Sequence, residues 1–147
     1  MTTGERTDPY PNFRFHVEID SLLVAGFSEV QGLEVEVETE EHEEGGVNHY
    51  THELPKRVTF PNLTLRKGLT GSPVLWSWIS ESLHGTATRK TGRIVLLDAS
   101  GLEVRGWEFL EGYPVRWEGP ELSADQSDVA IETLEIAHNG LRAFGVR

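Results

Sequence analysis

Cysteine is absent from the 147-residue chain, which excludes disulfide bonds, thiol catalysis and cysteine-ligated zinc. Basic charge is scarce: 13 Lys and Arg residues stand against 24 Asp and Glu residues, so the formal net charge is −11. A nucleic-acid binder needs a basic surface to neutralise phosphates, and a protein held on anionic lipid needs one as well. The charge balance therefore argues against both classes.

Long apolar runs are also missing. No stretch approaches the roughly 20 apolar residues of a membrane span, and residues 1–11 are polar, unlike a signal peptide. We expect a protein that is made in the cytoplasm and has no membrane anchor. The length fits a single domain over residues 1–147, and the 37% of hydrophobic residues supply one modest core.

Alternation of apolar and polar residues dominates the chain and predicts a mainly β fold. Pro61 removes a backbone donor and so interrupts one strand pattern, while Gly106 shifts another alternation, which indicates a bulge. Residues 98–101, Asp-Ala-Ser-Gly, are typical of a turn. We expect about seven strands, near residues 13–19, 33–38, 58–65, 94–97, 102–109, 113–117 and 129–138.

One helix is predicted, at approximately residues 73–84. Ser72 is suited to cap its N-terminus through the hydroxyl, and Pro73 fits the first helical position, where no backbone donor is needed. Gly85 can end the helix in the left-handed conformation. The helix should face the core with the apolar residues spaced along one side: Leu75, Trp78, Ile79 and Leu83.

An acidic segment separates the second and third predicted strands. Five glutamates fall within the seven residues 38–44, and Gly45 and Gly46 follow them. Such a segment cannot pack internally. We expect a hairpin arm at approximately residues 38–55 that is solvated or touches another chain.

Catalytic, cofactor and metal sites are not recognisable in the sequence. The glutamates lie on one strand face and one loop, whereas a glycosidase needs two carboxyl groups that face each other across a cleft. His42, His49 and His52 match no standard metal-binding spacing. The chain also lacks the Gly-x-Ser-x-Gly elbow and the phosphate-binding loop. We therefore predict no enzyme, no cofactor and no metal.

The order of short motifs resembles one known family, the inner-tube proteins of contractile tails in phages and in extracellular injection particles. The resemblance covers residues 8–142. Its N-terminal motifs are Asn12-Phe13-x-Phe15-x-Val17-x-Ile19-Asp20 and Ala25-Gly26-Phe27-Ser28-Glu29-Val30-x-Gly32-Leu33. Its central motifs are Glu44-Gly45-Gly46, Leu54-Pro55, Asn62-Leu63-Thr64-Leu65-x-x-Gly68 and Leu75-Trp76-x-Trp78. Its C-terminal motifs are Trp107, Gly112-Tyr113-Pro114, Gly119-Pro120-x-Leu122 and Val129-Ala130-Ile131-Glu132-x-Leu134-Glu135-x-x-His138-x-Gly140-Leu141.

The resemblance implies a β-barrel of two packed antiparallel sheets with one flanking α-helix. It implies hexameric rings in which each subunit's sheet joins its neighbours' sheets, and which stack into a hollow tube inside a contractile sheath. The haemolysin-coregulated proteins of type VI secretion are distantly similar. The implied partners are copies of this chain, a sheath protein, and baseplate and tube-terminating proteins. The implied location is a virion tail or an extracellular contractile particle.

Two groups of residues are candidates for this function. We expect the polar strand face with Glu34, Glu36 and Glu38 to line the channel, so that DNA or protein cargo slides past without specific binding. We expect the arm to contact the next ring through Glu41, His42, Glu43, Glu44, Gly45, Gly46, Asn48 and His49. The alternatives are a tube-cap or baseplate relative of the same fold, and a monomeric β-barrel that binds a small ligand in an apolar cavity.

Overall fold

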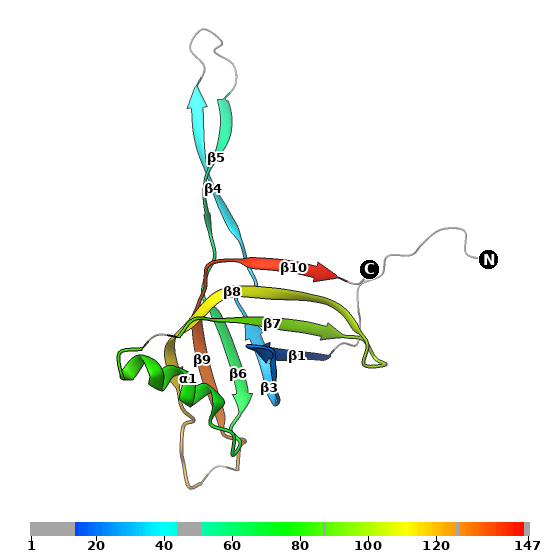
Figure 1. Ribbon diagram of the computed structural model, residues 1–147, viewed down its shortest axis with the longest axis vertical. Coiled ribbons are helices and arrows are strands. Elements are labelled where there is room, and N and C mark those ends of the chain that lie inside the picture. Colours follow the sequence, from blue (N-terminus) through cyan, green and yellow to red (C-terminus); the bar gives the residue numbers. More distant parts are fainter. Residues whose placement is uncertain (1–13, 44–50, 87, 126, 146–147) are drawn as a thin grey trace, which may run out of the picture.

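The structure is a computed structural model that describes residues 14–43, 51–86, 88–125 and 127–145. Ten strands and one helix follow one another along these residues (Figure 1). They are β1 (Arg14–Ile19), β2 (Leu22–Val24), β3 (Phe27–Gln31), β4 (Glu36–Glu43), β5 (Thr51–Thr59), β6 (Leu63–Gly68), α1 (Val74–Leu83), β7 (Lys90–Leu97), β8 (Glu103–Glu118), β9 (Ile131–Ala137) and β10 (Leu141–Gly145).

The long strand β8 organises the sheet. Eight strands form one antiparallel sheet in the order β2-β1-β7-β8-β9-β6-β3, and β10 pairs with β8 off this path. The first part of β8 pairs with β7 and β10, and the last part, from Tyr113, pairs with β9. We call β2-β1-β7-β8-β10 the first half-sheet and β8-β9-β6-β3 the second half-sheet. The strands of the two half-sheets run across one another in Figure 1.

The predicted barrel of two packed sheets is only partly right. The fold is mainly β with one helix, and side chains of both half-sheets share one core, including Val17, Ile94, Leu65 and Leu134. However, the half-sheets are one continuous sheet, because β8 runs through both instead of ending between them. Within the described residues β2 and β3 end the path without pairing to each other, so the chain forms no closed barrel by itself.

The bulge expected at Gly106 is wrong. Gly106 itself stays in register between Val95 of β7 and Phe144 of β10. The register shifts of β8 fall close by, between Glu103 and Arg105, and farther along the strand, between Phe109 and Gly112 and between Pro114 and Arg116. A glycine is needed at this position for packing, because a Cβ atom here would collide with the ring of Phe144. The interrupted alternation therefore marks a place where an aromatic ring covers the strand.

Helix α1 lies where the sequence predicts a helix, and it packs against β8. Leu75 and Trp78 are buried in the core and Ile79 packs against it. Leu83, the last residue of the helix, does not join them, since it is 67% exposed. The helical face predicted for the core is therefore correct over its first two turns only.

The expected N-cap of α1 is also wrong. The helix begins one residue later, with Pro73 at the N-cap position and no side-chain cap, while the backbone N–H of Ser72 donates to Thr70 Oγ1 over 3.2 Å. The ending of the helix is as predicted, since Gly85 adopts a φ of +83°. The left-handed conformation costs glycine little, so it ends the helix without strain.

The predicted turn at residues 98–101 is confirmed. The Asp98 N–H donates to the Leu102 carbonyl over 2.9 Å, and Gly101 has a φ of +88°. The Ser100 hydroxyl and the Leu102 N–H donate to the Asp98 carboxylate, and these hydrogen bonds lower the pKa of Asp98 below its usual range. This tight turn joins β7 to β8.

Among the described residues, no helix combines the length and the apolar character needed to cross a membrane.

Candidate assembly surfaces

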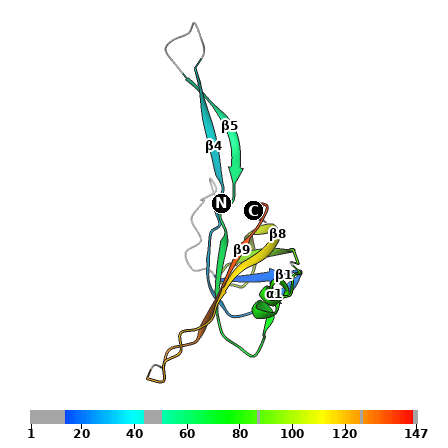
Figure 2. The same cartoon turned by 90° about the vertical axis from the view of Figure 1, so that its left-hand side faces the viewer.

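The arm is a two-stranded hairpin that stands away from the body of the molecule. It consists of β4 and β5, which form a separate sheet, and it extends along the longest axis in Figures 1 and 2. The register places Val37 opposite Val58 and Glu38 opposite Arg57, and it shifts between Glu38 and Thr39. Thr39 lies opposite Pro55, so the irregularity falls beside a residue that cannot donate to the ladder.

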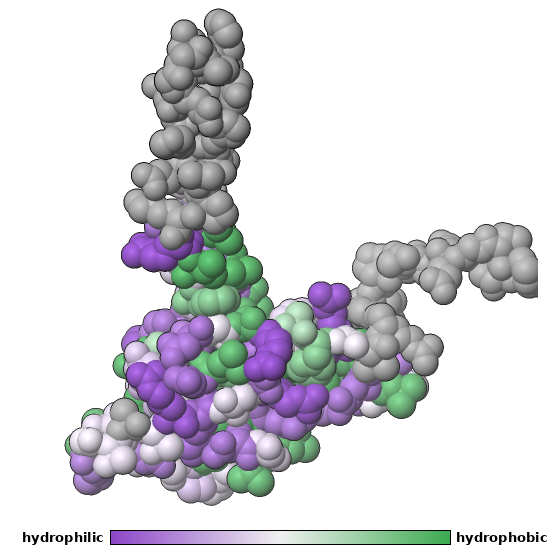
Figure 3. All heavy atoms as spheres, turned by 45° about the horizontal axis from the view of Figure 1, so that its top comes forward, coloured by the Kyte–Doolittle hydropathy of each residue, from purple (hydrophilic) through white to green (hydrophobic). Residues whose placement is uncertain are grey.

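The root of the arm exposes apolar side chains. Val35, Val37 and Val58 are each half exposed or more, and Figure 3 shows apolar surface where the arm joins the body. A two-stranded hairpin is at best marginally stable in water unless its apolar face is covered. This face is therefore a candidate contact surface.

Two of the three acidic candidates lie on the other side of the arm. Glu36 and Glu38 alternate with Val37 along β4 and so point to the opposite face of the hairpin. Glu38 forms an exposed ion pair with Arg57, whose guanidinium Nη2 lies 2.9 Å from the carboxylate. Glu34 precedes the strand and is exposed beside a groove at the arm root. The structure thus brings Glu36 and Glu38 together on one face, and sequence reasoning missed the Arg57 partner.

Only part of the predicted arm contact lies within the described residues. Glu41, His42 and Glu43 form the end of β4. Glu44, Gly45, Gly46, Asn48 and His49 fall outside the described residues. Their role stays a prediction.

His138 fastens the root of the arm to the body. Its Nε2 lies 3.1 Å from the Pro61 carbonyl oxygen, and its Nδ1 lies 3.1 Å from the Gly140 carbonyl oxygen and 3.2 Å from the Gly140 backbone nitrogen. The ring also packs at a tilt on Phe60, with 5.6 Å between ring centroids. Because residues 60–61 follow β5 directly, this buried histidine links the end of β5 to the body.

A ladder of alternating charges crosses the solvent face of the first half-sheet. The paired residues, in order from β10 to β1, are Arg142, Glu108, Arg93 and Glu18. Arg142 lies 3.4 Å from Glu108, and Arg93 lies 3.2 Å from Glu18. Opposite charges on neighbouring strands support the register.

The same face holds one group of possible metal ligands, His16, Glu18 and Glu103. Arg93 contacts both carboxylates, at 3.2 Å and 3.9 Å, and His16 Nε2 lies 3.1 Å from Glu18. The guanidinium already supplies the cation for these two acids. We therefore interpret the group as part of the charge ladder.

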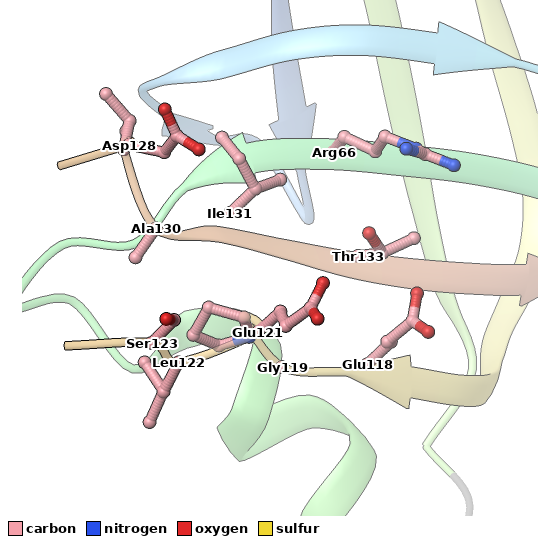
Figure 4. A pocket seen from close by; sticks show the side chains of 12 residues that line it. Arg66, Glu118, Gly119, Glu121, Leu122, Ser123, Asp128, Ala130, Ile131 and Thr133 are labelled. Atoms are coloured by element: carbon pink, nitrogen blue, oxygen red, sulfur yellow. The ribbon is translucent and has the colours of Figure 1, made fainter. Parts of the chain in front are cut away.

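A hollow of about 520 Å³ lies beside the segment between β8 and β9 (Figure 4). In Figure 1 this segment lies at the end of the molecule opposite the arm. The residues around it include three acids and one base: Arg66, Glu118, Glu121 and Asp128. Leu122 and Val129, which also line it, are strongly exposed. The hollow is open and acidic, unlike the apolar internal cavity that a small-ligand carrier requires.

A buried ion pair joins β6 to β9. Lys67 and Glu132 face each other in the register, their side chains are only 1% and 3% exposed, and Nζ lies 3.5 Å from Oε2. Lys67 Nζ donates to the Gly68 carbonyl, and Trp117 Nε1 donates to Glu132 Oε1, both over 3.0 Å. Sequence reasoning missed this pair, although Lys67 continues the buried alternation of Leu63 and Leu65.

Comparison with known protein families gives one match that covers most of the chain. The model of the T4-like virus tail tube protein gp19 matches residues 11–142. No curated protein sequence matches the chain significantly.

Several solved structures share the fold. A chain of the sheath–tube complex of an extracellular contractile injection system, PVC, in its extended state is 25% identical, with a TM-score of 0.83 over 94% of this chain and 93% of that chain. A chain of the anti-feeding prophage tube-terminating cap is 22% identical, with a TM-score of 0.87 over 99% and 97%. Hcp1 from Flavobacterium johnsoniae is 14% identical, with a TM-score of 0.58 over 89% and 94%.

Proposed function

Because this chain belongs to the T4-like virus tail tube protein gp19 family, we propose that it is a structural inner-tube subunit of a contractile tail or injection particle. Six copies close into a ring, rings stack into a hollow tube, and a contractile sheath surrounds the tube. The chain performs no chemistry, and its work is to enclose a passage for DNA or protein cargo. The tube ends on baseplate and terminating proteins.

The observation that carries this proposal is the arm. It stands clear of the body with an exposed apolar root, so a single chain leaves it without the cover that a hairpin needs. A stack of rings requires two different surfaces that fit each other. The arm at one end and the opposite end of the body, with the hollow at Leu122 and Val129, are suitable surfaces for such a contact.

The test of this proposal is the assembly state of the purified chain. We expect rings and tubes with a central hole in negative-stain electron microscopy, and more of them as salt is added. Six chains in one ring each bring a formal charge of −11, and salt screens their repulsion. A chain that stays monomeric at every salt concentration would contradict the proposal.

The arm can be tested separately. Deletion of residues 40–52 is expected to leave single rings or monomers, because the stacking contact is lost. The same sample should keep its melting temperature, since the buried core lies in β1, β2, β6, β7, β8, β9 and α1. Long tubes from the deletion variant would show that another surface stacks the rings.

A tube-terminating cap is the second candidate, supported by the TM-score of 0.87 to such a chain. A cap should form single rings that bind the end of a tube and do not stack on themselves. The microscopy distinguishes the two roles, because only a tube subunit elongates.

The channel wall is proposed to include Glu34, Glu36 and Glu38. Carboxylates repel DNA phosphates and acidic proteins, so cargo passes without binding. We expect tubes with Glu36→Lys and Glu38→Lys to retain DNA at low salt and to release it at high salt. The control is Glu103→Lys with Glu111→Lys on β8, away from the arm and the hollow, since Glu38 and Glu103 each have an arginine partner. Equal retention by both variants would reject the assignment.

A further inference from the structure

The connection between β9 and β10 contains the dipeptide Asn139-Gly140, in which Asn139 is exposed and Gly140 is buried. The backbone nitrogen after an asparagine can attack the carbonyl carbon of the asparagine side chain. A glycine hinders this approach least, because it has no Cβ atom and its backbone is adaptable. The other asparagines, Asn12, Asn48 and Asn62, are followed by Phe, His and Leu. Asn139 is therefore the asparagine whose neighbour is best suited to such an attack.

A base lies next to the nitrogen that would attack. The Gly140 backbone nitrogen lies 3.2 Å from His138 Nδ1, and His138 Nε2 lies 3.1 Å from the Pro61 carbonyl oxygen. In the neutral tautomer with its proton on Nε2, the ring donates to Pro61 and presents Nδ1 to the Gly140 N–H as an acceptor. The ring is buried and packs at a tilt on Phe60 and Phe109. His138 is thus placed to receive the Gly140 proton as a general base.

A carboxylate lies next to the amine that would leave. Asn139 Nδ2 donates to Glu111 Oε2 over 2.9 Å. Positive charge builds up on this nitrogen when it takes a proton and departs as ammonia, and a carboxylate already in place stabilises that charge. The same hydrogen bond orients the Asn139 amide. Glu111 therefore assists the departure of the amine.

The backbone holds Glu111 in an uncommon conformation. Its φ of +51° lies in the left-handed region, which is costly for a residue with a Cβ atom. It stands where β8 passes from the first half-sheet to the second, and its carbonyl accepts from Arg89 Nη1 over 3.4 Å. Such conformations gather at functional sites, where the surrounding structure maintains them. The bend of β8 thus keeps the Glu111 carboxylate beside Asn139.

Two backbone hydrogen bonds hold the dipeptide against this bend. The Asn139 N–H donates to the Leu110 carbonyl over 2.9 Å, and the Leu110 N–H donates to the Gly140 carbonyl over 3.0 Å. Base, nucleophile and leaving amine are therefore kept together by the fold. Fixed proximity of reacting groups lowers the entropic part of a barrier.

We propose that Asn139 is a self-modification site that loses ammonia and becomes an acidic residue. His138 Nδ1 takes the proton from the Gly140 nitrogen, which attacks Asn139 Cγ and closes a succinimide ring. The bond from Cγ to Nδ2 breaks, and the amine leaves as ammonia with the proton that came from Gly140. Water then opens the ring at either carbonyl and gives aspartate or isoaspartate. Each chain reacts once and turns over no other substrate.

The modification changes the root of the arm. An acid at position 139 no longer donates to Glu111, and the two carboxylates repel each other. Isoaspartate also lengthens the backbone in a connection that Leu110 holds on both sides. Because His138 links this connection to Pro61 at the end of the arm, the products loosen the arm root as the protein ages.

Peptide mapping by mass spectrometry of the stored chain tests the proposal, whatever its assembly state. We expect aspartate and isoaspartate to accumulate at position 139 and not at the exposed Asn62. Gly140→Ala should react about tenfold more slowly, because its methyl group hinders the attack. The variant should fold, since a Cβ atom there would meet Phe60 and Leu110 at ordinary distances of 3.7 Å and 3.8 Å. An Asn139 that stays intact while the urea-unfolded chain reacts would overturn the proposal.

The urea-unfolded chain also measures what the fold contributes. It keeps the dipeptide but loses the proximity of His138 and Glu111, so we expect the folded chain to react about tenfold faster or more. Glu111→Gln should slow the folded chain, because a neutral amide stabilises a positive amine less than a carboxylate does. Faster reaction in urea than in the folded chain would show that the fold protects Asn139, and would overturn the roles of both side chains.

The effect on the arm root is measured with Asn139→Asp, which imitates one product. We expect a lower melting temperature than in the parent chain, because two carboxylates then meet at the bend of β8. Asn62→Asp adds the same charge at an exposed position and is the matched control, expected to melt close to the parent chain. Equal melting temperatures of the two variants would reject the proposed loosening.

Discussion

Replacing Lys67 with methionine is expected to lower the free energy of unfolding by about 3–5 kcal/mol. The substitution leaves the Glu132 carboxylate buried without its cationic partner, since both side chains are almost fully enclosed. Trp117 Nε1 still donates to Glu132, but one hydrogen bond from a neutral donor does not replace an ammonium group. Urea denaturation of the monomeric chain measures the loss.

Two further variants separate the buried charge from the lost side chain. Lys67→Met with Glu132→Gln should be more stable than Lys67→Met alone, because it removes both charges and leaves an amide to accept from Trp117. Arg57→Met breaks the exposed pair with Glu38 and should cost no more than about 1 kcal/mol. Equal losses of unfolding free energy in Lys67→Met and Arg57→Met would show that the buried ion pair stabilises the fold no more than the exposed one.

Trp78→Ala is expected to cost about 3–5 kcal/mol of unfolding free energy. The ring is 2% exposed in the shared core, and Nε1 donates to the Thr88 carbonyl over 2.9 Å. Truncation therefore leaves a cavity between α1 and the sheet and an unpaired carbonyl. Thermal and urea unfolding of the purified chain measure the change.

Trp76 is the matched control for this prediction. It lies on the same helix and is 46% exposed, and its ring meets that of Trp117 in an edge-to-face arrangement with 4.8 Å between ring centroids. Trp76→Ala should be clearly less destabilising than Trp78→Ala, because less apolar area leaves water on folding. Trp78→Phe should lie between them, since it keeps an aromatic ring and loses only the indole N–H.

Local patterns were good predictors where one face of an element is buried. The alternation in β1, the turn at Asp98 and the helical end at Gly85 each follow from forces within a few residues. The alternation of Glu36 and Glu38 with Val37 likewise anticipated two distinct faces of the arm. These features needed no knowledge of distant partners.

Features that depend on distant partners were not predicted. β2, β3 and β10 are short strands whose existence depends on pairing with other parts of the sheet. The partners Lys67 and Glu132 are far apart in the sequence, so only the register of β6 and β9 brings them together. The role of Gly106 was predicted wrongly because the ring that fills the space beside it belongs to Phe144, in the last strand. Leu83 fits the helical spacing, but at the end of the helix it stays exposed.

The shared strand β8 has a mechanical consequence. Its 16 residues carry the hydrogen bonds of both half-sheets, with no linker between them. A load applied to one half-sheet therefore reaches the other along a covalent backbone. Its transmission does not depend on side-chain packing alone. Neither half can detach and leave the other intact, so the subunit should yield as one unit.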